Sequence, residues 1–148
     1  MTPLEVAQTQ LGVEEVPRGS NWGPQVKDYL LSVGIDFAAN WCMAFVYWCV
    51  KKSEYKNTLV KTGGVLKQFR KIDPRYIVPL NEEPRPGDIF IMDFGNGLGH
   101  TGIVESVEDH MIHTIEGNTN DENSRNGYEV CRRYRFKDKI NGYIRLNQ

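Results

Sequence analysis

The sequence has few of the features that mark disulfide-rich, membrane or nucleic-acid-binding proteins. Only three of its 148 residues are cysteines, and a small, odd number argues against a disulfide framework. No apolar run approaches the roughly 18 residues that span a bilayer. The net charge of −1 gives no reason to expect nucleic acid or an anionic membrane surface as a partner. We therefore expect no nucleic acid and no membrane among the partners.

A zinc motif and an export signal are also missing. No two cysteines have CxxC spacing, so we expect no zinc site. The N-terminus, Met-Thr-Pro-Leu-Glu-Val-Ala-Gln, has neither a basic start nor an apolar centre and is not a signal peptide. We expect the chain to stay inside the cell, to leave by a route that uses no such signal, or to have been trimmed.

What the chain does contain is a helical first half. Thr2, Pro3 and Glu5 predict a capped helix start, and Gly12 should end that helix. Pro24 opens a second predicted helix that stops at Gly34. Two further helices are expected over residues 42–52 and, more weakly, over 64–71.

The second half is rich in short apolar runs separated by turn residues. The candidate strands are 88–93, 100–107, 111–116, 128–135 and 141–146. Helices followed by strands predict an α+β fold rather than alternating βαβ units. The length suits one domain over residues 1–148, since no linker or repeat divides the chain.

Cys42 stands where a nucleophile would be expected. It follows Trp41 at the start of helix 42–52, which is apolar on nearly every side and should be surrounded by protein. A helix N-terminus favours a thiolate and leaves backbone N–H groups free to hold an oxyanion. The alternative is a small core residue, because buried cysteines are common and usually inert. Cys49 lies deep in the same helix, and Cys131 has no base nearby in sequence.

His100 is the best candidate for a base among the three histidines. It opens a predicted strand between glycines, which leave room for a ligand or another backbone, whereas His110 falls at a turn. If the next strand stays extended, Glu116 and Asn118 point to the same side, and either could accept a hydrogen bond from the imidazole. Taken alone, Glu116 would more often be an exposed strand-end carboxylate and Asn118 a turn former.

Four motifs, in this order, resemble those of the CHAP domain, the cysteine, histidine-dependent amidohydrolase/peptidase family. They are Trp41-Cys42-x-Ala44-Phe45-Val46, Pro86-Gly87-Asp88-Ile89, Gly99-His100-Thr101-Gly102-Ile103-Val104 and Glu116-Gly117-Asn118. The resemblance implies a papain-like fold, with the nucleophile helix 42–52 packed against an antiparallel sheet of about five strands over 88–146. Residues 1–35 are similar to the helical lead-in of related bacterial and phage wall hydrolases.

The resemblance also implies a function and a set of roles. CHAP enzymes cleave peptidoglycan, either at the amide between N-acetylmuramic acid and L-alanine or within the peptide stem or cross-bridge. By position, Cys42 resembles the nucleophile, His100 the general base, Glu116 the residue that orients the histidine, and Asn118 the polar group that often follows. This mechanism needs no metal or other cofactor. Calcium helps some members, but the chain lacks an acidic loop of the required pattern.

The related NlpC-type peptidases suggest another orienting residue. They use a second histidine at about the offset of His113 from His100. Strand alternation puts His113 on the face opposite to Glu116, so we favour Glu116, although a bulge between them would reverse this argument.

Loop and aromatic residues near these motifs are candidates for substrate contact. Trp41 adjoins the nucleophile, and Asn21 and Trp22 lie in a loop of the kind where function collects. Weaker candidates are Asn96, Asn120 and Arg125, while Tyr47 and Trp48 are better explained as core.

Two alternatives to a wall hydrolase stay open on the same fold. One is a cysteine peptidase or deamidase that acts on a protein, and the other is an inactive domain that binds peptides. A wall hydrolase would act outside the cytoplasm, as a phage lysin, as a toxin delivered into rival cells, or as part of a longer protein. A toxin would need an immunity protein as partner. We expect a monomer.

Overall fold

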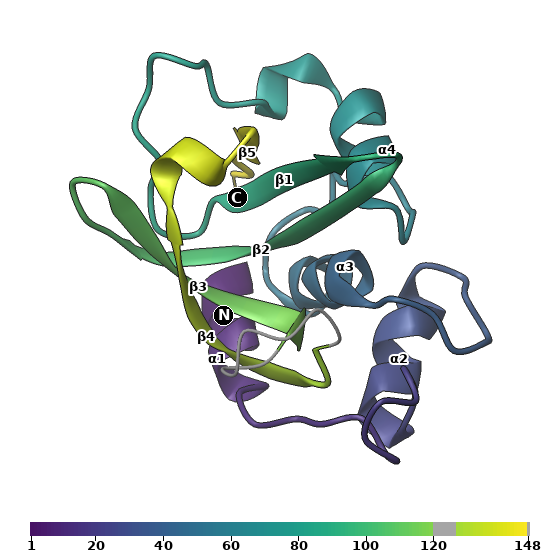
Figure 1. The fold of residues 1–148 in the computed structure, drawn as a ribbon. Coiled ribbons are helices and arrows are strands. Elements are labelled where there is room, and N and C mark those ends of the chain that lie inside the picture. Colours follow the sequence, from purple (N-terminus) through teal and green to yellow (C-terminus); the bar gives the residue numbers. More distant parts are fainter. Residues whose placement is uncertain (120–126, 148) are drawn as a thin grey trace.

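The computed structural model of the chain describes residues 1–119 and 127–147 (Figure 1). The helices are α1 (Pro3–Thr9), α2 (Pro24–Ser32), α3 (Cys42–Lys52) and α4 (Val65–Lys71), with short 3₁₀ turns at Pro74–Tyr76 and Lys137–Lys139. The strands are β1 (Ile89–Gly95), β2 (Leu98–Val107), β3 (Met111–Thr119), β4 (Glu129–Phe136) and β5 (Gly142–Ile144). They form one antiparallel sheet in the order β4-β3-β2-β1-β5, which confirms the predicted α+β fold.

Local capping signals set the helix starts, as the sequence predicts. The Thr2 hydroxyl accepts a hydrogen bond from the Glu5 amide at 3.2 Å, and the Glu5 carboxylate accepts one from the Thr2 amide at 2.9 Å. Pro24 occupies the first turn of α2, where its missing N–H costs nothing. The prediction for the end of α1 was wrong by a few residues, because the helix stops at Thr9 before reaching Gly12.

The sheet buries both of its faces. Because side chains alternate along a strand, Ile89 and Ile91 face one way and Phe90 and Met92 the other. The first pair joins the main core, which includes Phe45 of α3, and the second pair joins a smaller cluster with Val104. Figure 1 shows α3 lying centrally against the sheet. Three register shifts interrupt the pairing, at Asp93/Gly95, at Val104/Ser106 and at Glu116/Thr119.

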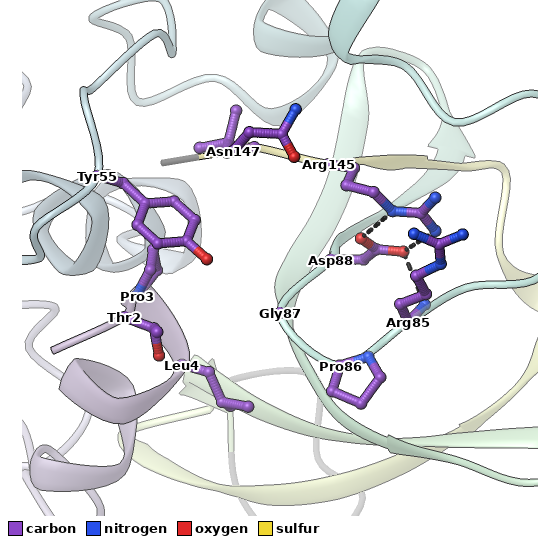
Figure 2. Close-up of a pocket in the computed structure, with 11 residues that line it drawn as sticks. Thr2, Pro3, Leu4, Tyr55, Arg85, Pro86, Gly87, Asp88, Arg145 and Asn147 are labelled. Atoms are coloured by element: carbon purple, nitrogen blue, oxygen red, sulfur yellow. Dashed lines mark hydrogen bonds and ion pairs between the residues drawn. The ribbon is translucent and has the colours of Figure 1, made fainter.

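The Pro86-Gly87-Asp88 motif holds the start of β1. The buried Asp88 carboxylate accepts hydrogen bonds from Arg145 Nε at 2.9 Å and Nη2 at 2.8 Å, and from the Arg85 amide at 2.8 Å (Figure 2). These groups line a cavity of about 340 Å³, to which Cys42 and His100 do not contribute. The motif thus fixes the fold at a distance from the predicted site. Within residues 1–119 and 127–147, no helix has the length and apolar character to cross a membrane.

Candidate active site

Cys42 is the first residue of α3, as the sequence predicts, and its side chain is nearly buried. It is 6% exposed, and no side chain caps the helix start at Trp41. The first backbone bond of this turn runs from the Phe45 amide to the Trp41 carbonyl at 2.9 Å, so the Cys42 N–H precedes the helical ladder. Cys49 is different, because burial raises the pKa of its thiol well above the ordinary value. A thiol with an open helix N-terminus beside it is the better placed of the two to react.

His100 connects Cys42 to Glu116. Its Nε2 lies 2.7 Å from Glu116 Oε1, and Cys42 is close enough to the ring to raise the pKa of His100. Burial by itself lowers the pKa of His100, but the hydrogen bonds and negative charge of Cys42 and Glu116 outweigh burial and raise that pKa to about 9. The imidazole is therefore held in its protonated form at neutral pH.

The Glu116 carboxylate is fully buried and has no direct access to water. Besides His100, it accepts hydrogen bonds from Arg135 Nε at 2.9 Å, from Arg135 Nη2 at 2.6 Å and from Thr114 Oγ1 at 2.6 Å. Burial raises the pKa of Glu116, but Arg135 and His100 outweigh that effect and hold it well below the ordinary range. A permanently ionised carboxylate thus lies behind the imidazole.

Gly102 explains how the carboxylate fits into the sheet. A Cβ at Gly102 would lie 2.7 Å from Glu116 Cγ, 2.8 Å from the Ile115 carbonyl oxygen and 2.8 Å from Phe90 Cε2. No side chain fits at this position. The Glu116 side chain therefore packs directly against the main chain of β2 where it reaches His100.

The Asn118 side chain hydrogen-bonds main-chain groups rather than the imidazole. Its Oδ1 accepts a hydrogen bond from the Trp41 amide at 2.7 Å, and its Nδ2 donates one to the Gly127 carbonyl at 2.8 Å. The condition under which Glu116 and Asn118 would point to the same side is not met, because Asn118 has a φ of 56° and the strand register shifts there. The amide instead ties the start of α3 to the end of β3.

The other histidines lie outside this arrangement. His113 Nε2 lies 3.1 Å from Glu108 Oε2 at an exposed position, and His110 is exposed at the turn between β2 and β3. β3 pairs regularly with β4 from His113 to Glu116, so these two side chains lie on opposite faces, and Glu116 rather than His113 contacts His100.

One predicted substrate contact must be corrected. Trp41 is fully buried, stacks on Tyr29 with ring centroids 5.6 Å apart, and donates from Nε1 to Glu15 Oε2 at 2.7 Å. A side chain with no exposed surface cannot touch a substrate, so the prediction for Trp41 was wrong. Trp22 is partly buried beside Asn21 in the loop before α2, and substrate contact by these two stays a prediction.

Of the three weaker candidates for substrate contact, the structure describes Asn96. Asn96 is exposed in the β1–β2 turn with a φ of 57°. Asn120 and Arg125 lie outside the described residues. Tyr47 and Trp48 pack partly buried against the main core, in agreement with the prediction.

Sequence reasoning missed Arg135 and Thr114. Arg135 falls in the predicted strand 128–135, but only the pairing of β3 with β4 reveals that it reaches Glu116. Within residues 1–119 and 127–147, no three histidine, cysteine or acidic residues are grouped so as to hold a metal ion.

Comparisons with known proteins agree with this fold. The family model of the CHAP domain matches residues 34–118, and these include the Cys42, His100 and Glu116 positions. A crystal structure of the wild-type endolysin LysIME-EF1 is similar in fold, with a TM-score of 0.62 and 16% sequence identity over 99% of this chain. The chain spans 65% of that endolysin chain. No curated protein matches the sequence. Because the family model covers more than half of the sequence, this chain belongs to the CHAP domain family.

Proposed function

We propose that this chain is a peptidoglycan hydrolase that cleaves an amide bond with Cys42 as nucleophile. Membership of the CHAP family and a fold similar to an endolysin support action on the bacterial cell wall. The observation that carries the proposal is the His100 imidazole, which is hydrogen-bonded to the buried Glu116 carboxylate and whose pKa is raised by Cys42. A thiol, a base and a group that orients the base form an arrangement that nucleophilic acyl transfer commonly uses.

The reaction would proceed through a thioester. With the Cys42 proton on His100, the thiolate attacks the amide carbonyl, and a C–S bond forms as the carbonyl oxygen becomes an oxyanion. The backbone N–H of Cys42 is placed to donate to that oxygen. The His100 imidazolium gives its proton to the leaving amine as the C–N bond breaks. Water, deprotonated by His100, then releases the carboxylic acid and regenerates Cys42.

Glu116 stays ionised throughout this cycle. It fixes the orientation of the imidazole through the 2.7 Å hydrogen bond and stabilises the positive charge on His100. Its carboxylate accepts four hydrogen bonds, from His100, Arg135 and Thr114. We therefore expect His100, and not Glu116, to carry the proton that is transferred.

The finer proposal concerns the bond that is cut. The candidates are the N-acetylmuramoyl-L-alanine amide and an amide within the peptide stem or cross-bridge. Mass spectrometry of digested wall sacculi decides between them, since free stem peptides appear only in the first case. We also propose that the chain acts outside the cytoplasm, as a monomer, with an immunity protein if it is a delivered toxin.

The direct test is a Cys42→Ala variant. We expect the release of soluble wall fragments to fall by roughly 10⁴-fold or more, as happens when the nucleophile of a coupled catalytic group is removed. Cys49→Ala is the matched control, because Cys49 lies fully buried in the same helix and should leave activity largely intact. Circular dichroism checks that both variants are folded.

Three outcomes would contradict the proposal. A fully active Cys42→Ala variant would remove Cys42 from the mechanism. Cleavage or deamidation of proteins without attack on sacculi would indicate a peptidase or deamidase. Binding of stem peptides without any turnover would indicate an inactive binding domain.

A further inference from the structure

We propose that Arg135 is a positioning residue, which holds Glu116 in the orientation and charge state that His100 needs. This inference rests on the proposed function, because it assigns a role within the same site. The side-chain hydrogen bonds of Arg135 go to Glu116 rather than to the reacting groups Cys42 and His100.

The geometry is that of a two-pronged clamp. Arg135 Nη2 donates to Glu116 Oε1 at 2.6 Å, and Arg135 Nε donates to Oε2 at 2.9 Å. Oε1 is the oxygen that also contacts His100 Nε2 at 2.7 Å. Paired N–H donors fix both the position and the plane of a carboxylate, which a single bond does not. Arg135 thus determines where Oε1 lies relative to the imidazole.

Charge makes the clamp necessary. A fully buried carboxylate favours its neutral form unless a cation compensates it. The groups on the same face as Glu116 are Thr114 from its own strand, His100 from β2, and Cys131, Arg133 and Arg135 from β4. The positive charge of Arg135 beside Glu116 does not depend on pH, because a guanidinium stays protonated. His100 compensates the carboxylate only while it carries its own proton.

The same strand provides a matched control. Arg132 lies on the opposite face of β4 and binds Glu105 through Nε at 2.8 Å and Nη2 at 3.1 Å. Its side chain is 60% exposed, against 20% for Arg135. Both arginines therefore form forked ion pairs, but only the pair of Arg135 adjoins the imidazole.

The test compares Arg135→Met, Arg135→Lys and Arg132→Met with the wild type. The first readout is the rate at which iodoacetamide alkylates Cys42 as a function of pH, followed on the Cys42 peptide by mass spectrometry. It reports the thiolate–imidazolium pair and needs no substrate. The second readout is kcat and KM for release of fragments from sacculi.

We expect Arg135→Met to protonate Glu116 at neutral pH and so to destabilise the imidazolium. The acid limb of Cys42 alkylation should move to higher pH, and the rate at pH 6 should fall about 10- to 100-fold, the effect of one charge-assisted hydrogen bond. The value of kcat should fall by a similar factor, with KM within about twofold. Arg135→Lys keeps the charge without the fork and should lose only about three- to tenfold. Arg132→Met should match the wild type.

An unchanged alkylation profile in folded Arg135→Met would overturn the inference, and a rise in KM alone would show a substrate contact instead. If Arg135→Met does not fold, Arg135→Lys decides, and wild-type alkylation and kcat in that variant would overturn the inference. A wild type that is alkylated as expected but releases nothing from sacculi would count against the proposed function alone.

Discussion

At the scale of single residues, the charge on His100 is the property on which the chemistry depends. Its pKa lies near 9 rather than at the ordinary 6.5, so the native state favours the protonated ring. The stabilisation from this charge is fully present below pH 6.5 and is lost as the pH rises through about 9. The catalytic step that consumes the proton, its donation to the leaving amine, should follow the same curve.

We therefore predict that kcat/KM falls as the pH rises through about 9. Glu116→Gln removes a negative charge that raises the pKa of His100, so this alkaline limb should move to lower pH and kcat should fall. Glu108→Gln is the control, since Glu108 lies 3.1 Å from the exposed His113 instead. Initial rates on sacculi across the pH range measure both effects. An alkaline limb that stays in place in Glu116→Gln would contradict the prediction.

At the scale of elements, the start of α3 is held from three directions. Its Trp41 amide is bonded to Asn118, its Trp41 indole is bonded to Glu15, and Gly117 allows β3 to approach closely. A Cβ on Gly117 would lie 2.7 Å from the Trp41 ring and 2.9 Å from Phe45 Cβ. Contacts with β3, the strand that also carries Glu116, therefore help to position Cys42.

We predict that Asn118→Gly misplaces the nucleophile. Glycine tolerates the φ of 56°, so the variant removes the side-chain bonds to Trp41 and Gly127 without adding backbone strain. The free energy of unfolding should fall by about 1–3 kcal/mol, and kcat should fall about tenfold, since small misplacements are costly in catalysis. Urea unfolding and sacculus digestion measure the two quantities.

Asn118→Asp is the companion variant. It keeps an acceptor for the Trp41 amide and loses only the donor to Gly127, so it should retain more activity than Asn118→Gly. Equal, wild-type turnover in both variants would show that the Asn118 amide has no part in placing α3.

Elements are predictable from the sequence where their signals are local. The capping pair of Thr2 and Glu5, Pro24 and the apolar run after Cys42 mark three helix starts correctly. The order of the motifs along the chain also links Cys42, His100 and Glu116 in one hypothesis, and His100 interacts with both of the other residues.

The failures share a different cause, which is contact between distant segments. Burial of Trp41 depends on Glu15 and Tyr29, and the turn at Asn118 depends on the Trp41 amide. Predicting that Arg135 contacts Glu116 requires the register of β3 with β4, and strand patterns alone do not fix that register.

At the scale of the whole molecule, Asp88 and Arg145 join the start of the sheet to the last segment of the described chain. Arg145 also donates to Glu82 Oε2 at 3.1 Å and to the Glu83 carbonyl at 3.1 Å, so one guanidinium organises the approach to β1. Figure 2 shows this group among the residues that line the cavity. The pair should contribute to stability and leave the chemistry alone.

Asp88→Asn should therefore lower the free energy of unfolding by about 3 kcal/mol, the usual cost of removing one partner from a buried ion pair. Activity per folded molecule should stay within about twofold. Glu14→Gln is the control, because it removes an exposed pair with Arg18 and should cost less than about 1 kcal/mol. Thermal unfolding and turnover at a temperature well below the midpoint measure both. A loss of turnover without a loss of stability would contradict this assignment.

Position 102 of β2 has room for no side chain larger than the hydrogen atom of glycine. Its neighbours within 3 Å of an added Cβ include the Ile115 carbonyl oxygen, which belongs to the main chain of β3 and cannot swing aside. One extra methyl group at Gly102 would push Glu116 away from His100 while leaving the sulfur and the ring intact. The smallest side chain at Gly102 would thus separate the Glu116 carboxylate from the His100 imidazole. The protein would keep Cys42 but lose the negative charge that holds the imidazole protonated.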